Sequence, residues 1–71
     1  MNETVRLLKL FGEYDYAMES IKDEIEVGNY DGAFGIEVHR KDYDEITEEM
    51  EEFFDGQDVA EIYVSWDLNI D

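Results

Sequence analysis

Residues 42–55 constrain the fold of this 71-residue chain more than any other segment, because they hold eight Asp or Glu residues and neither Lys nor Arg. The apolar side chains of the segment recur at the spacing of one helical face. They are Tyr43, Ile46, Met50, Phe53 and Phe54. We therefore expect an amphipathic helix over residues 42–55 with carboxylates on its outer face. Asp42 would cap this helix, Glu45 would complete an Asp variant of the capping box, and Gly56 would end it.

The carboxylates of this expected helix lack the support that a surface of mixed charge provides. Glu–Lys pairs three or four residues apart stabilise an exposed helix, whereas like charges at that spacing repel. Acids in the last turn also oppose the helix macrodipole, at about 0.3–1 kcal/mol each at low salt. Glu51, Glu52 and Asp55 would lie at that end, as would Glu24 and Glu26 in the preceding helix. Solubility alone does not require this placement, which favours a role in binding.

The composition indicates one small acidic domain, residues 1–71. The net charge is −16, from 21 acidic and five basic residues, and 44% of the residues are hydrophobic. This charge disfavours nucleic acid and anionic membranes as direct ligands, so we expect a basic protein as the partner. The chain lacks Cys, which excludes disulfides and thiolate chemistry. Because neither a signal peptide nor an apolar membrane span is recognisable, we expect a cytoplasmic protein.

Hydrophobic periodicity predicts the remaining elements. Residues 5–11 form a short apolar run that is typical of a central strand. Residues 13–27 repeat apolar side chains at helical spacing, and a Gly-Asn stop signal follows them. Residues 34–38 and 60–69 alternate apolar and polar side chains, as half-buried strands do.

These elements predict the order β-α-β-α-β and a small two-layer sandwich of the α/β (α+β) class. A three-stranded sheet would carry the two acidic helices on one face and leave its other face open. Right-handed crossovers would place both helices on the same face. A different pairing with one antiparallel strand is the alternative.

The side chains form no recognisable catalytic or metal site. His39 is the only histidine and stands beside Arg40 and Lys41, so we interpret it as a surface residue. A calcium loop needs oxygen ligands at its first and last positions and a glycine between them. Placing Gly32 or Gly56 at the glycine position leaves Val or Phe where ligands are required. We therefore expect a protein that is not an enzyme, without a cofactor and without a metal ion.

The acidic side chains would form two rows along the helix of residues 42–55, because residues three and four apart are neighbours. One row comprises Asp44, Glu48, Glu51 and Asp55, and the other comprises Glu45, Glu49 and Glu52. Such rows could imitate the phosphates of a duplex, which carries about one charge per 1.7 Å of axis. The preceding helix would extend the surface with Glu19, Asp23, Glu24 and Glu26.

In length, charge and the acidic run 42–55, the chain resembles the small acidic inhibitors of phages and other mobile elements, which include DNA-mimic and anti-CRISPR proteins. The resemblance implies a stoichiometric inhibitor located in the host cell cytoplasm. It would occupy the basic nucleic-acid channel of a target such as a CRISPR effector complex. No family residue corresponds position by position.

Other functions fit the same charge. An immunity protein or antitoxin that neutralises a basic nuclease toxin would have similar electrostatics, as would an acidic regulator of a transcription protein. The alternative to any partner-binding function is that the acidic surface is only solvated, or is an adaptation to high salt. The open sheet face, where Tyr63 is expected to be exposed, could also pair two copies as a homodimer.

Overall fold

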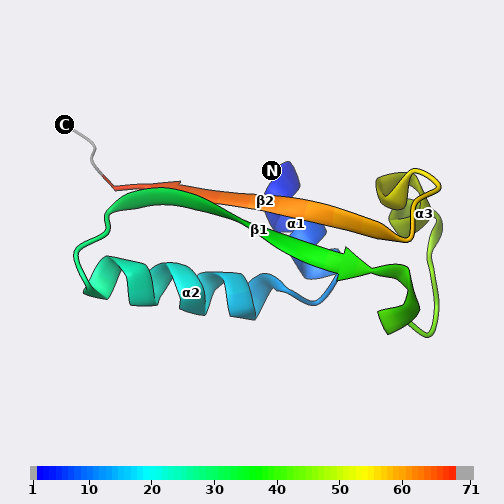
Figure 1. The fold of residues 1–71 in the computed structure, drawn as a ribbon, viewed down its shortest axis with the longest axis horizontal. Helices are drawn as coiled ribbons and strands as arrows, with labels where there is room; N and C mark the ends of the chain where they lie inside the picture. Colours follow the sequence, from blue (N-terminus) through cyan, green and yellow to red (C-terminus); the bar gives the residue numbers. More distant parts are fainter. Residues whose placement is uncertain (1, 69–71) are drawn as a thin grey trace.

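An antiparallel pair of strands with helices beside it and at one end makes up the fold (Figure 1). The structure is a computed structural model that describes residues 2–68. In chain order the elements are α1 (Glu3–Leu10), α2 (Tyr14–Glu26), β1 (Asp31–His39), the 3-10 turn η1 (Arg40–Asp42), α3 (Glu48–Phe54) and β2 (Val59–Asp67). The α+β class is confirmed.

The predicted three-stranded β-α-β-α-β arrangement is wrong. Within residues 2–68 the sheet has two strands, β1 and β2, which pair antiparallel from Asp31 opposite Asp67 to His39 opposite Val59. Antiparallel neighbours need no crossover helix, so α3 lies instead in the connection at the end of the strand pair (Figure 1).

The segment expected as the first strand is the helix α1. Asn2 caps it by accepting a hydrogen bond from the Thr4 N–H at 2.8 Å, and Glu3 and Lys9 lie at the ends that suit the helix dipole. Arg6 pairs with Glu3 one turn earlier. These local signals decide between helix and strand, which a short apolar run leaves ambiguous.

Glycines end the first two helices, as the sequence predicted for α2. At the end of α2, the Asn29 N–H donates to the Glu24 carbonyl and the Gly28 N–H to the Ile25 carbonyl, at 2.9 and 3.0 Å. This is the Schellman pattern, and Gly28 adopts the positive φ of 92° that the pattern needs. Gly12 ends α1 in the same way.

The two strands show the predicted alternation, with one buried face and one exposed face. Ile36, Val38, Ile62 and Val64 are buried on the inner face. On the outer face Tyr63 is 72% exposed.

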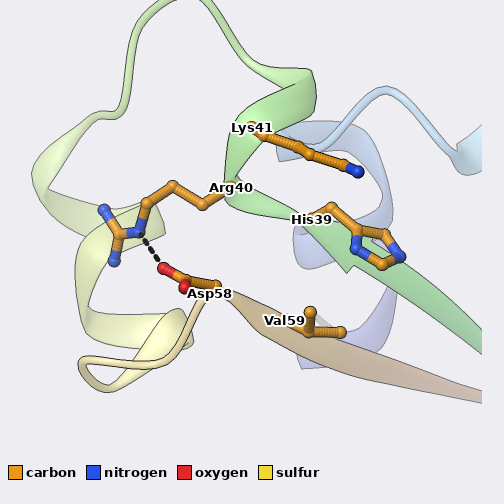
Figure 2. Close-up of a pocket in the computed structure, with 5 residues that line it drawn as sticks. All are labelled: His39, Arg40, Lys41, Asp58 and Val59. Carbon is orange, nitrogen blue, oxygen red and sulfur yellow. Dashed lines mark ion pairs between the residues drawn. The ribbon is translucent and has the colours of Figure 1, made fainter.

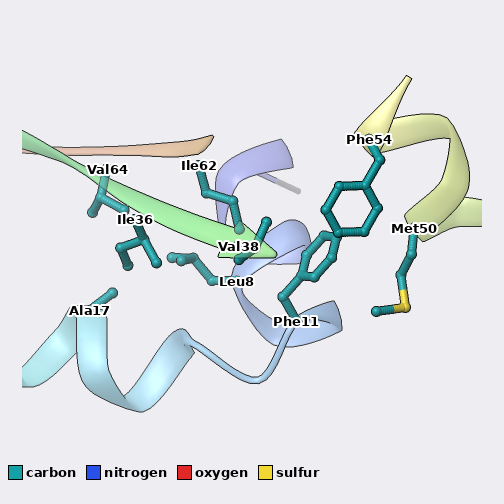
Figure 3. Packing of buried hydrophobic residues seen from close by; sticks show 9 residues of the cluster. All are labelled: Leu8, Phe11, Ala17, Ile36, Val38, Met50, Phe54, Ile62 and Val64. Atoms are coloured by element: carbon teal, nitrogen blue, oxygen red, sulfur yellow. The ribbon is translucent and has the colours of Figure 1, made fainter. Parts of the chain in front are cut away.

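The core gathers where the inner sheet face meets α1 and α3 (Figure 3). Phe11 lies at its centre, with ring centroids 5.4 Å from Tyr43, 5.2 Å from Phe53 and 5.6 Å from Phe54. Met50 and Phe54 anchor α3 in this cluster, whereas α2 contributes only Ala17 as a buried side chain. Of the two acidic helices, α3 therefore places more of its side chains in the core than α2 does.

The helix predicted over residues 42–55 is shortened to the seven residues of α3. Asp42 belongs to the turn η1, so the expected capping box with Glu45 does not form. Thr47 is the cap, and its hydroxyl accepts a hydrogen bond from the Met50 N–H at 3.2 Å. Before it, the Tyr43 hydroxyl donates to the Phe11 carbonyl at 3.2 Å, which holds this segment against the end of α1.

Candidate acidic interface

The exposed carboxylates of α3 are the strongest candidate for a functional surface. Glu48, Glu49, Glu51 and Glu52 are all exposed on this helix, and its other side buries Met50 and Phe54. Asp55 follows as the C-cap in the left-handed conformation, with φ of 54°. The packing of the apolar side thus fixes which way the acids face.

Two arginines from other elements pair with α3. Arg6 of α1 donates hydrogen bonds to both Glu3 and Glu49. Arg40 of η1 donates to Glu51, and its guanidinium lies 5.0 Å from the centroid of the Phe54 ring. Through their hydrogen bonds, Arg6 lowers the pKa of the Glu3 carboxyl and Arg40 lowers that of Glu51. Glu49 and Glu51 therefore have internal partners that tie α3 to the rest of the fold.

The observed start of α3 changes which of its acids lie at the unfavourable carboxyl end of the helix dipole. Because α3 begins at Glu48, the acids Glu48, Glu49 and Glu51 lie in its first turn, where negative charge is favourable. The prediction that Glu51 opposes the macrodipole is wrong. Glu52 and Asp55 remain toward the carboxyl end.

The two predicted rows of charge are also shorter than expected. Asp44 and Glu45 precede α3 and do not share its helical spacing. Among residues 2–68, Glu48, Glu52 and Asp55 form no ion pair within the fold. These three carboxylates are the part of α3 that remains available to a partner.

The acids of α2 form a separate surface. Glu19, Asp23 and Glu26 are exposed, and Glu24 accepts a hydrogen bond from the Asn29 side chain at 2.9 Å. Figure 1 shows α2 running beside β1, away from the end of the strand pair where α3 lies. The structure does not bring the acids of α2 and α3 together into one continuous face.

His39, Arg40 and Lys41 line a pocket of about 410 Å³ near α3, together with Asp58 and Val59 (Figure 2). Figure 2 shows Arg40 turned toward α3 and away from His39 and Lys41. Arg40 lies 3.8 Å from Asp58, and the His39 Nε2 atom lies 3.0 Å from a Glu37 oxygen. Carboxylates of the fold thus lie beside His39 and Arg40, two of the three nitrogen-bearing side chains of this pocket.

Sequence reasoning missed the partners Arg6 and Arg40, and it missed a groove between α2 and β1. The groove has a volume of about 440 Å³, and Gly32 and Gly35 of β1 contribute to its lining. Glycine within a strand often marks a place where another group approaches closely, so Gly32 and Gly35 were the sequence features that could have indicated the groove.

Across residues 2–68, no three His, Asp or Glu side chains are grouped as a metal ion would require. No helix in this part of the chain is long and apolar enough to cross a membrane. No family model, curated protein or solved structure matches the chain.

Proposed function

We propose that this protein is a stoichiometric inhibitor that binds the basic nucleic-acid channel of a partner protein through the free carboxylates at the α3 end. One observation carries the proposal: Glu48, Glu52 and Asp55 are exposed and have no ion pair among the described residues, in a chain of net charge −16. Lys and Arg side chains that normally contact phosphates would pair with these carboxylates. A CRISPR effector complex is one target of this kind.

The residue roles within this surface are unequal. Glu49 and Glu51 already pair with arginines, so a partner would have to compete for them. Asp44 and Glu45, which lie just before α3, extend the free surface. The remaining acids, including those of α2, raise the association rate by long-range attraction, which salt screens beyond about 10 Å at 0.1 M.

A pair of matched triple variants tests the proposal. Glu48→Gln/Glu52→Gln/Asp55→Asn removes three charges at α3, and asparagine suits the left-handed conformation of residue 55. Glu19→Gln/Asp23→Asn/Glu26→Gln removes the same number of charges from α2. Both proteins and the wild type would be used as bait in a host lysate at low and high salt, and captured proteins identified by mass spectrometry.

The captured protein would then be purified and its nucleic-acid binding measured with each variant added. We expect wild type and the α2 variant to displace nucleic acid, and the α3 variant to displace it at least about tenfold less well. Equal displacement by both triple variants would show that net charge acts without a defined interface. Capture of a nuclease toxin or a transcription protein would instead indicate an immunity protein or a regulator.

A further inference from the structure

The groove between α2 and β1 lies along an unpaired strand edge. β1 has β2 on one side and no other strand among residues 2–68. Residues from α2, β1 and β2 line the groove, among them Tyr16, Glu24, Gly32, Ala33, Gly35 and Trp66.

The hydrogen-bond pattern shows which backbone groups face away from β2. The Leu68 N–H donates to the Tyr30 carbonyl and the Arg40 N–H to the Asp58 carbonyl, both at 2.8 Å, and the register between them is continuous. In an antiparallel pair, alternate residues bond across the pair and the residues between them point outward. Ala33 and Gly35 therefore direct their N–H and C=O groups away from β2, at the edge that borders the groove.

This edge lacks the usual protection against pairing. Natural edge strands carry charged side chains, Pro or a bulge, are very short, or are covered by a helix or loop. The acidic residues of β1, Asp31 and Glu37, lie on either side of the Ala33–Gly35 stretch and would attract a basic strand. β1 is nine residues long, contains neither Lys nor Pro, and pairs with β2 without a bulge. Gly32 and Gly35 have no side chains of their own, and the Trp66 ring and the Glu61 side chain of β2 lie over them on the faces of the sheet.

The walls of the groove suit a basic side chain. Tyr16 is 61% exposed, and the indole N–H of Trp66 donates to the Asn29 carbonyl at 3.1 Å, which orients the ring. The Trp66 ring lies so close to Gly32 that a methyl group there would approach it to 2.9 Å. Aromatic faces attract Lys and Arg, and the Glu24 carboxylate adds charge at the same place. A second copy of the chain would bring another net charge of −16 to this surface, which disfavours self-pairing.

We propose that the free edge of β1 accepts an extended, Lys- or Arg-containing segment of a partner protein as an added third strand. The backbone of the segment would bond to Ala33 and Gly35, and its basic side chains would lie over Tyr16, Trp66 and Glu24. Addition of a strand to an open edge is an established mode of peptide recognition. The inference is independent of the role proposed for α3, because it concerns a different surface.

The fluorescence of Trp66 provides a direct test, because it is the only tryptophan in the chain. The probe is a short capped peptide of alternating Lys and Thr, compared with the same peptide N-methylated at every second residue. Methylation keeps the charge and removes the strand hydrogen bonds. We expect a saturable change in Trp66 emission with the first peptide and at least about tenfold weaker binding of the second. Equal affinities, or no saturable change with either peptide, would overturn the proposal.

Two proline variants locate the binding edge. Ala33 and Ser65 are directly opposite each other, and the N–H of each points outward, but at opposite edges of the sheet. Ala33→Pro should weaken binding of the unmethylated peptide about tenfold, whereas Ser65→Pro should leave it unchanged. Wild-type affinity in a folded Ala33→Pro protein would overturn the proposal. If circular dichroism shows that Ala33→Pro is unfolded, the comparison of the two peptides decides alone. A dimer in sedimentation that the peptide does not dissociate would also overturn it, because a second copy would then occupy the edge.

Discussion

The acidic helices α2 and α3 look alike in sequence but differ in what surrounds them. In α3, arginines from two other elements bind Glu49 and Glu51, and Met50 and Phe54 anchor the helix in the core. In α2, Ala17 is the one fully buried side chain, and the only acid with a hydrogen bond to another side chain is Glu24. Among residues 2–68, similar charge thus serves two ends in α3, where Glu49 and Glu51 hold the helix to the fold and Glu48 and Glu52 stay unpaired, whereas no acid of α2 has an arginine partner.

The largest expected effect comes from removing the anchor of α3. Phe54→Ala deletes a side chain that is 1% exposed and should lower the free energy of unfolding by about 3–5 kcal/mol. Phe34→Ala, beside α2 and only partly buried, is the matched control and should cost clearly less. Urea unfolding followed by circular dichroism measures both. Equal losses would show that the two regions are equally well packed.

The arginine contacts of α3 provide the next comparison. Arg40→Gln and Lys22→Gln change the net charge equally, but only Arg40 pairs with carboxylates and contacts Phe54 among the described residues. We expect Arg40→Gln to lower the melting temperature more than Lys22→Gln at the same salt concentration. Equal melting temperatures for the two variants would show that the ion pairs of Arg40 add no measurable stability, which is common for exposed ion pairs.

A pH series should separate a paired acid from a free one. The hydrogen bond from Arg40 lowers the pKa of Glu51 below the usual 4.5, so the folded state binds this proton less readily than the unfolded state. The pair therefore stabilises the protein above that pH, and its contribution is lost as the pH falls through the lower folded-state pKa.

We accordingly expect the stability difference between wild type and Glu51→Gln to be largest near neutral pH and to shrink below pH 4.5. Glu26→Gln is the control, because it removes an exposed carboxylate of α2 that has no ion pair with any described residue. Urea midpoints at several pH values measure the differences. A difference for Glu51→Gln that stays constant through this range would contradict the assigned ion pair.

The smallest effect should come from the free acids of α2. Glu19→Gln/Asp23→Asn/Glu26→Gln reduces self-repulsion and should raise the melting temperature slightly at low salt, and less at high salt because salt already screens these charges. Glu49→Gln/Glu51→Gln should lower it instead, since both lose arginine partners. If the melting temperature moved in the same direction in both variants, the acids of α2 and the paired acids of α3 would not differ in their effect on stability.

Strong periodicity made α2 and both strands predictable, but the α3 region depended on distant residues. The apolar run of residues 5–11 fits a helix or a strand, and the cap at Asn2, which lies outside the run, decides for the helix. The expected helix start at Asp42 failed because Thr47 is the cap and Tyr43 contacts Phe11, 32 residues away.

The candidate surface was predictable only as a list of acids. Arg6 lies 43 residues from Glu49, and Arg40 lies 11 residues from Glu51. Helical spacing relates neighbours within one element, so it cannot show which carboxylates a distant arginine will bind. Glu48, Glu52 and Asp55 were separated from Glu49 and Glu51 by the tertiary fold alone.

The position of Phe11 has a consequence for synthesis on the ribosome. Its aromatic neighbours Tyr43, Phe53 and Phe54 are added only after α1, α2 and β1 have been made. The nascent chain therefore exposes Phe11 without its aromatic neighbours until α3 emerges. The sheet cannot form until β2 has been synthesised as well. Such exposed surface is where nascent chains aggregate. Residues 1–41 hold nine of the 21 acidic residues and all five basic ones, so most of the negative charge that could keep unfinished molecules apart is itself added late, from residue 42 onward.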